Sequence, residues 1–138
     1  MSSRYTPTLI DHFTQPRHVG MPEEADASGQ GGGGPLCPED MATVWIRVRD
    51  GRIAEIYHKT MGCPVAIASS SMTCVLAQGK TLAEALEITR ERVIEALGGV
   101  PEHKVDSIVA PEALHRAVRA YLEKAQGLPT EAPSPSGA

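Results

Sequence analysis

Apolar residues near the N-terminus recur at the spacing of a helix. Leu9, Ile10 and Phe13 fall on one side of a helical projection of residues 6–14. Pro16 follows closely, and proline cannot continue a helix because it lacks the N–H group that the next turn needs. We therefore predict a short helix that ends before Pro16.

A β-hairpin follows further along the chain. Residues 41–49 alternate between apolar and polar side chains, as in a strand with one buried face. Asp50-Gly51 is a two-residue hairpin turn signal, and residues 53–60 have the composition of a return strand. Ile53 and Ile56 differ in parity, so we expect a β-bulge or a twist in the return strand.

The second half of the chain has helical periodicity. Residues 65–78 predict a helix that ends at Gly79. A capping box at residues 81–84 opens an apolar stripe that continues to Gly98, as one helix or as two. A loop over residues 100–106 then leads to a last helix. The apolar face of that helix contains Leu114, Ala117, Val118, Tyr121 and Leu122.

Strands that precede a series of helices indicate an α+β domain. We predict a small antiparallel β-sheet with helices packed on one face. The 138 residues are enough for one domain, which we assign to residues 1–127. Residues 128–138 contain three prolines, two serines and a glycine, and we predict a disordered tail there.

Composition and charge restrict the function. The net charge is −4 and no basic run occurs, which argues against a nucleic-acid binder. No apolar stretch approaches the roughly 18 residues of a membrane span, and the N-terminus has no signal-peptide pattern. We therefore expect a cytoplasmic protein with no membrane partner. In that reducing compartment, three cysteines indicate metal ligands, nucleophiles or core residues rather than disulfides.

Cys63 is the most informative of these cysteines. It stands between a predicted strand and a predicted helix, and Pro64 suits the first helical turn. The positive end of the helix dipole favours a thiolate at this position, and the thiolate is the form that binds metal or accepts sulfur. A small buried side chain is the alternative interpretation.

Cys37 precedes the hairpin and has two carboxylates, Glu39 and Asp40, within three residues. A hairpin returns its two ends to the same edge, so Cys37 becomes a neighbour of Cys63. Cysteine and carboxylate together can bind Zn²⁺ or iron. The glycine-rich run before Cys37, residues 28–35, is either a flexible linker or a mobile loop that delivers Cys37 to this site.

Other cysteine and serine side chains that could react or bind metal fit a structural role better. Cys74 lies about 16 Å from Cys63 along the helix axis, too far to share a small metal centre, and we assign it to the core. The serines at positions 69–71 have no nucleophile-elbow motif around them, so we expect them to permit close helix packing.

The five histidines do not pair at metal-ligand spacing, and we expect most of them to be surface or half-buried residues. His103 is the exception, because its loop can approach the end of the domain that holds the cysteines.

From residue 5 to residue 122 the chain resembles the IscU/NifU N-terminal scaffold family. The N-terminal segment at residues 11–20 matches the family pattern, as do the first ligand loop at residues 33–37 and the second ligand with its helix at residues 59–71. The match continues through residues 79–85.

The resemblance implies a scaffold for the assembly and transfer of iron–sulfur clusters, not an enzyme. It implies a transient [2Fe–2S] cluster or a zinc ion, sulfur supplied by a cysteine desulfurase, and apo-proteins that receive the cluster. It further implies that Cys37 and Cys63 are the first two ligands, with Glu39 where the family usually has aspartate. We expect a monomer or a weak homo-oligomer.

Two departures from the family pattern change this picture. The third ligand segment, Lys-x-His-Cys-Ser in the family, is represented by residues 103–107, so Val105 stands at the histidine and Asp106 at the cysteine. The chaperone-recognition segment Leu-Pro-Pro-Val-Lys is represented only by residues 99–103, which weakens the expectation of a dedicated chaperone. Four ligands can still come from Cys37, Cys63 and Asp106, with Glu39, Asp40 or His103 as the fourth.

Carboxylates bind iron–sulfur centres less tightly than thiolates, so we expect a labile cluster. Three hypotheses remain open at this point. The first is the cluster scaffold. The second is a zinc-binding accessory protein that accepts sulfur from a cysteine desulfurase without building a cluster. The third is a binding protein that keeps the fold but has lost the metal chemistry.

Overall fold

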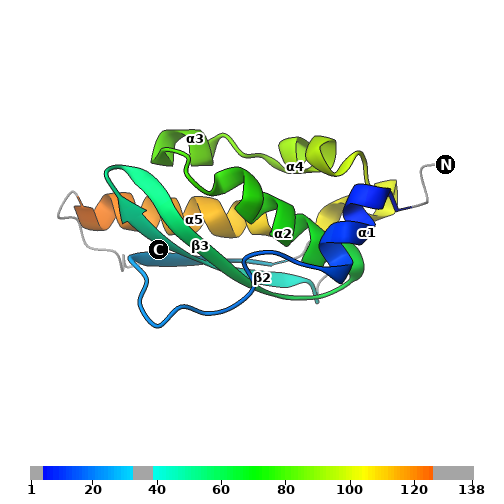
Figure 1. The fold of residues 1–138 in the computed structure, drawn as a ribbon, viewed down its shortest axis with the longest axis horizontal. Coiled ribbons are helices and arrows are strands. Elements are labelled where there is room, and N and C mark those ends of the chain that lie inside the picture. The colour runs from blue at the N-terminus through cyan, green and yellow to red at the C-terminus, as the bar shows by residue number, and fades with distance from the viewer. Residues whose placement is uncertain (1–4, 33–38, 126–138) are drawn as a thin grey trace.

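The computed structural model describes residues 5–32 and 39–125 (Figure 1). Within these ranges the chain forms one small sheet and a set of helices. The strands are β1 (Ala27–Gly32), β2 (Met41–Arg49) and β3 (Arg52–Met61). The helices are α1 (Pro7–Thr14), α2 (Pro64–Ala77), α3 (Leu82–Leu86), α4 (Arg90–Leu97) and α5 (Ala110–Ala125), with a 3₁₀ helix, η1 (Glu102–Ser107), before α5. The predicted tail at residues 128–138 lies outside the described residues.

The sheet is antiparallel and has the strand order β1-β2-β3. The β2–β3 hairpin and the bulge predicted in its return strand are confirmed. The register shifts between Arg47 and Val48, which face Glu55 and Ile53. Ala54 is therefore one extra residue on β3, and the bulge lets both isoleucines of this strand reach the core despite their different parity.

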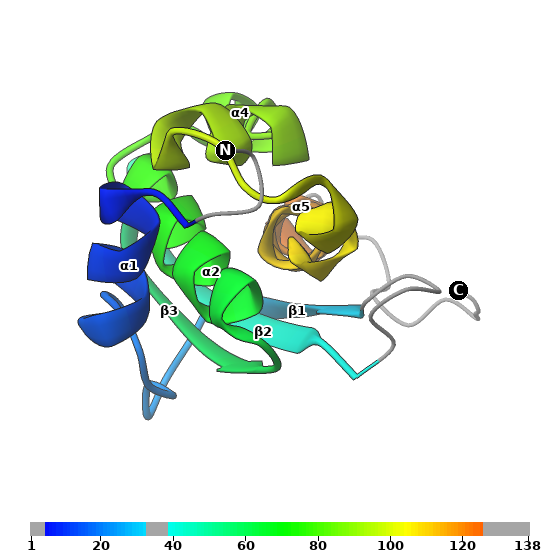
Figure 2. The same ribbon diagram turned by 90° about the vertical axis from the view of Figure 1, so that its right-hand side faces the viewer.

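The helices lie on one face of this sheet, as predicted for the α+β class. Helix α2 contacts β2 and β3, and α5 contacts β1 and β2. Helix α1 packs beside α2, and the pair α3 and α4 forms an outer layer over α2 and α5 (Figure 2). No helix of the described residues is long and apolar enough to cross a membrane.

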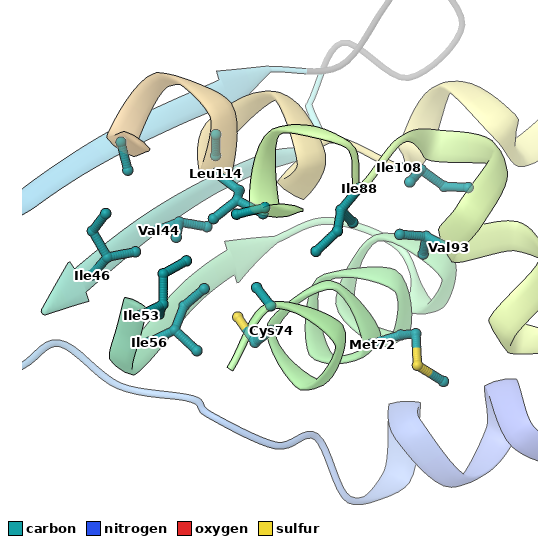
Figure 3. Packing of buried hydrophobic residues seen from close by; sticks show 14 of the residues in the cluster. Val44, Ile46, Ile53, Ile56, Met72, Cys74, Ile88, Val93, Ile108 and Leu114 are labelled. Carbon is teal, nitrogen blue, oxygen red and sulfur yellow. The ribbon is translucent and has the colours of Figure 1, made fainter. Parts of the chain in front are cut away.

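The core fills the space between the sheet and the helices that cover it. Figure 3 shows inward side chains of the hairpin, among them Val44, Ile46, Ile53 and Ile56, gathered with Cys74 of α2. Cys74 is completely buried, and burial raises the pKa of its thiol well above the usual range. The prediction that Cys74 is a core residue is confirmed.

The glycine-rich segment departs from the prediction. Residues 28–32 are neither linker nor mobile loop but belong to strand β1, while residues 33–35 lie outside the described residues. A Cβ atom on Gly29 would overlap the carbonyl oxygen of Ala113 and lie 2.5 Å from the backbone nitrogen of Ala117. Gly31 meets α5 in the same way at the carbonyl oxygen of Val109. These two glycines allow α5 to pack directly against the strand backbone.

The segment after α2 contains two helices, the second of the two predicted alternatives. The capping box predicted at Thr81 is present, but α3 ends at Leu86 and a second cap, Thr89, starts α4. The expected loop at residues 100–106 is also more regular than predicted, because η1 occupies residues 102–107. This short helix contains the whole third ligand segment, residues 103–107.

Two of the five histidines are buried. His12 and His58 are 6% and 1% exposed, whereas the other three are exposed or half-buried, as predicted for most of them. His58 Nε2 lies 3.0 Å from the carbonyl oxygen of Arg17, and its Nδ1 lies 2.9 Å from the hydroxyl of Thr60. Because a carbonyl only accepts, Nε2 carries the proton and Nδ1 accepts from Thr60. The ring is thus satisfied as a neutral imidazole.

We expect His58 to make folding sensitive to acid. Burial lowers its pKa from 6.5 to about 4. Below pH 6.5 the unfolded chain therefore binds a proton that the folded chain does not bind. Stability should fall as the pH drops from about 6.5 to about 4, by up to about 3 kcal/mol for this group.

The measurement is the free energy of unfolding between pH 7 and pH 4 for the parent and for His58→Gln. The variant should lose this part of the pH dependence, whatever its stability at pH 7. His103→Gln, which replaces an exposed histidine, is the control and should keep the full slope. Equal slopes for the parent and His58→Gln would contradict the assignment.

Candidate functional site

Cys63 occupies the junction between β3 and α2. It is the N-cap residue of α2, has extended backbone angles, and is followed by Pro64 at the first helical position. Its side chain makes no capping hydrogen bond to the helix. The thiol, which is half-buried, is therefore directed to groups from other parts of the chain.

The first of these groups is the carboxylate of Asp40. The backbone N–H of Cys63 donates to Asp40 Oδ1 over 3.1 Å, and Cys63 Sγ lies 3.7 Å from Oδ2. Asp40 is only 5% exposed. The contact follows from the hairpin, because Met41 at the start of β2 pairs with Met61 at the end of β3. The predicted neighbour of Cys63 was Cys37, which lies outside the described residues, so that prediction stays a prediction.

The second group is the hydroxyl of Ser107, at the end of η1. Ser107 is fully buried, and its Oγ lies 3.2 Å from Cys63 Sγ. Ser107 had no predicted role in the site. Its position next to Asp106 is the feature of the sequence that could have indicated a role, since a residue beside a predicted ligand also comes close to the site.

The other predicted site residues are placed differently. Asp106 forms an ion pair with Arg90 of α4, with Nη1 and Oδ1 3.5 Å apart. Glu39 and His103 are exposed, and Cys37 lies outside the described residues. Within residues 5–32 and 39–125, no three histidine, cysteine or acidic side chains are grouped closely enough to hold a metal ion. The described part of the site is therefore a thiol, a buried carboxylate and a hydroxyl.

The donor types fit iron better than they fit a hard cation. A cysteine thiolate suits zinc and iron–sulfur centres, whereas a carboxylate adds a harder and weaker ligand. Asp40 accepts a hydrogen bond from the Cys63 backbone, which fixes its carboxylate beside the thiol. The pair can supply two of the four ligands that an iron–sulfur centre or a tetrahedral zinc site needs.

Gly62 makes this arrangement possible, and its substitution provides a test. Its φ is +146°, and a Cβ atom there would overlap Asp40 Oδ1 and lie 2.8 Å from Asp40 Cγ. We expect Gly62→Ala to displace the Asp40 carboxylate and to lower the free energy of unfolding by about 3 kcal/mol, through backbone strain and steric overlap together. Denaturant unfolding measures this change.

Gly20→Ala is the matched control. Gly20 has a φ of +141°, close to that of Gly62, but among the described residues no atom lies within 4 Å of the Cβ that alanine would add, so this substitution brings backbone strain alone. We expect a loss of about 1–2 kcal/mol for this variant. Equal losses for the two variants would mean that Gly62 contributes only its backbone conformation and that Asp40 is not held by it.

Comparisons with known proteins show the family of the chain. The sequence model of the NifU-like N-terminal domain family matches residues 4–127. The iron-sulfur cluster assembly scaffold protein IscU 1 of Archaeoglobus fulgidus is 48% identical over 121 residues, which cover 87% of this chain and 78% of the relative. The IscU scaffold protein of Aquifex aeolicus is 39% identical over 134 residues, which cover 96% of this chain and 84% of the relative.

A solved structure supports the fold. The N-terminal NifU-like protein of Brucella abortus superposes with a TM-score of 0.66 at 18% identity, over 86% of this chain and 94% of that one. At this identity the similarity shows the shared α+β architecture alone.

Proposed function

Because the chain belongs to the NifU-like N-terminal domain family, we propose that it is a scaffold on which iron–sulfur clusters are assembled before they pass to other proteins. The observation that carries the proposal is the contact between Cys63 and the buried Asp40 carboxylate at the start of α2. The similarity to IscU scaffold proteins supports the same function.

In this proposal the cluster is cargo, held by Cys63 and Cys37 through their thiolates. Asp40 is the carboxylate that the geometry supports best, because it already contacts Cys63. Asp106, Glu39 and His103 remain predicted ligands. A ligand set with fewer thiolates than usual holds the cluster weakly, which suits a protein that has to release it.

The proposal also covers the partners, the compartment and the oligomeric state of the scaffold. We infer that sulfur comes from a cysteine desulfurase and that apo-proteins receive a [2Fe–2S] cluster. The scaffold itself acts without enzymatic turnover, in the cytoplasm, as a monomer or a weak homo-oligomer. The altered segment at residues 99–103 favours transfer without the dedicated chaperone of the family.

Anaerobic reconstitution tests the proposal. The purified protein is incubated with ferrous iron, cysteine, a cysteine desulfurase and a thiol reductant, which reduces persulfide sulfur to sulfide. Visible absorption is recorded together with iron, sulfide and zinc content. The scaffold function predicts sulfide-to-iron charge-transfer bands with equal iron and sulfide. A colourless protein that keeps zinc would support the zinc-binding accessory protein instead. A protein that keeps neither metal nor cluster would indicate a binding protein without metal chemistry.

A further inference from the structure

Arg90 connects the outer helix layer to the Cys63 site. Its Nη1 lies 3.5 Å from Asp106 Oδ1, and its Nε donates to the carbonyl oxygen of Ile108 over 3.3 Å. These two acceptors stand on either side of Ser107 in the sequence. Arg90 therefore holds the end of η1 at two points, which we call the Arg90 bridge.

The residue between the two points is the one that contacts the thiol. Ser107 Oγ lies 3.2 Å from Cys63 Sγ, and Ser107 is fully buried. We propose that Arg90 is a positioning residue for Cys63, which acts by holding Ser107 against the thiol, and that Asp106 serves this bridge as its carboxylate.

The chemistry of arginine suits this role. The planar guanidinium group carries donors at Nε and at both Nη atoms in a fixed geometry, so one side chain can bind a carboxylate and a carbonyl together. Arg90 directly follows Thr89, the N-cap of α4, so its backbone position is fixed by the start of the helix. Lysine has one flexible ammonium group and cannot reproduce both contacts.

The bridge gives Asp106 a role other than that of a metal ligand. Its carboxylate stands where the family has a cysteine, but in this chain it is paired with Arg90. The two side chains are 38% and 29% exposed, so solvent weakens the pair and the expected effects are moderate. If Asp106 is a metal ligand, substitutions of Arg90 and of Asp106 should have different effects from those expected if Asp106 belongs to the Arg90 bridge.

The first test is the alkylation rate of Cys63 by iodoacetamide in the metal-free protein, followed for the Cys63 peptide by mass spectrometry. Arg90→Gln loses both contacts of the bridge and should alkylate about two- to fivefold faster. Asp106→Asn should have a smaller effect, because Arg90 keeps its contact with the Ile108 carbonyl, and the double variant should match Arg90→Gln. Arg90→Lys should recover part of the protection. Arg92→Gln is the control on the same helix, with an exposed arginine, and should match the parent.

An unchanged alkylation rate in Arg90→Gln and Asp106→Asn would overturn the proposal, as would fully additive effects in the double variant. Thermal unfolding of each variant separates the local effect from a loss of fold. A global loss would expose Cys74 as well, so faster alkylation confined to Cys63 supports the bridge.

The second test rests on the proposed function and uses the half-life of the reconstituted cluster. The bridge predicts a moderately shortened half-life for Arg90→Gln and a smaller shortening for Asp106→Asn, which leaves the contact of Arg90 with the Ile108 carbonyl in place. Complete loss of the cluster in Asp106→Asn with no change in Arg90→Gln would overturn the bridge and make Asp106 a ligand. If the parent protein takes up no cluster, the proposed function fails, while the alkylation test still decides on the bridge.

Discussion

Replacement of Cys63 by alanine should abolish cluster retention. The thiol is half-buried beside the Asp40 carboxylate, and in the proposed site it is one of only two thiolates. Thiolates are the usual protein ligands of a [2Fe–2S] cluster, and the remaining donors are mostly hard oxygen ligands. We expect bound iron and sulfide to fall below about a tenth of the parent value.

Cys74→Ala is the matched control for this substitution. It removes the same chemical group from the same helix, but from the core side, where Cys74 is fully buried. The variant should be less stable by about 1 kcal/mol because of the small cavity, yet it should retain the cluster. Iron and sulfide analysis after anaerobic desalting compares the two variants. Full retention in Cys63→Ala would show that the ligand assignment is wrong.

A large effect on stability is expected from Gly29→Ala. A Cβ atom there would overlap the carbonyl oxygen of Ala113 and approach the backbone of Ala117. Helix α5 has to move away from β1 to make room, and this separates a close strand–helix contact. We expect the free energy of unfolding to fall by about 3 kcal/mol, at the upper end of overpacking effects. Urea denaturation measures the change through the midpoint and the m-value.

Gly32→Ala tests the same substitution at the end of the same strand. No atom lies within 4 Å of the added Cβ among the described residues, and Gly32 is exposed. This variant should be neutral or slightly more stable, because alanine has less backbone freedom to lose on folding. Similar losses in both variants would mean that the glycines serve strand flexibility rather than the packing of α5.

Local patterns were sufficient to predict most of the fold. The alternation in residues 41–49 and the Asp50-Gly51 turn predicted the hairpin, and the unequal parity of Ile53 and Ile56 predicted its bulge. These predictions succeeded because each depends on contacts between residues close in sequence.

The features that could not be predicted depend on distant parts of the chain. A glycine run looks the same whether it is flexible or lies under a helix, and only the position of α5 decides that Gly29 and Gly31 are packed. The burial of His58 depends on a partner 41 positions away, the Arg17 carbonyl. Arg90 likewise meets Asp106 only after α4 and η1 have folded against each other.

Cluster transfer is the most direct test of the scaffold function. The protein is loaded anaerobically, separated from free iron and sulfide, and mixed with an apo-ferredoxin that requires a [2Fe–2S] cluster, whose formation is followed by circular dichroism. The scaffold function predicts that the ferredoxin acquires its cluster faster than from equal amounts of free iron and sulfide, and that a chelator of free iron does not stop the transfer. Transfer that is no faster, or that the chelator abolishes, would contradict the scaffold function.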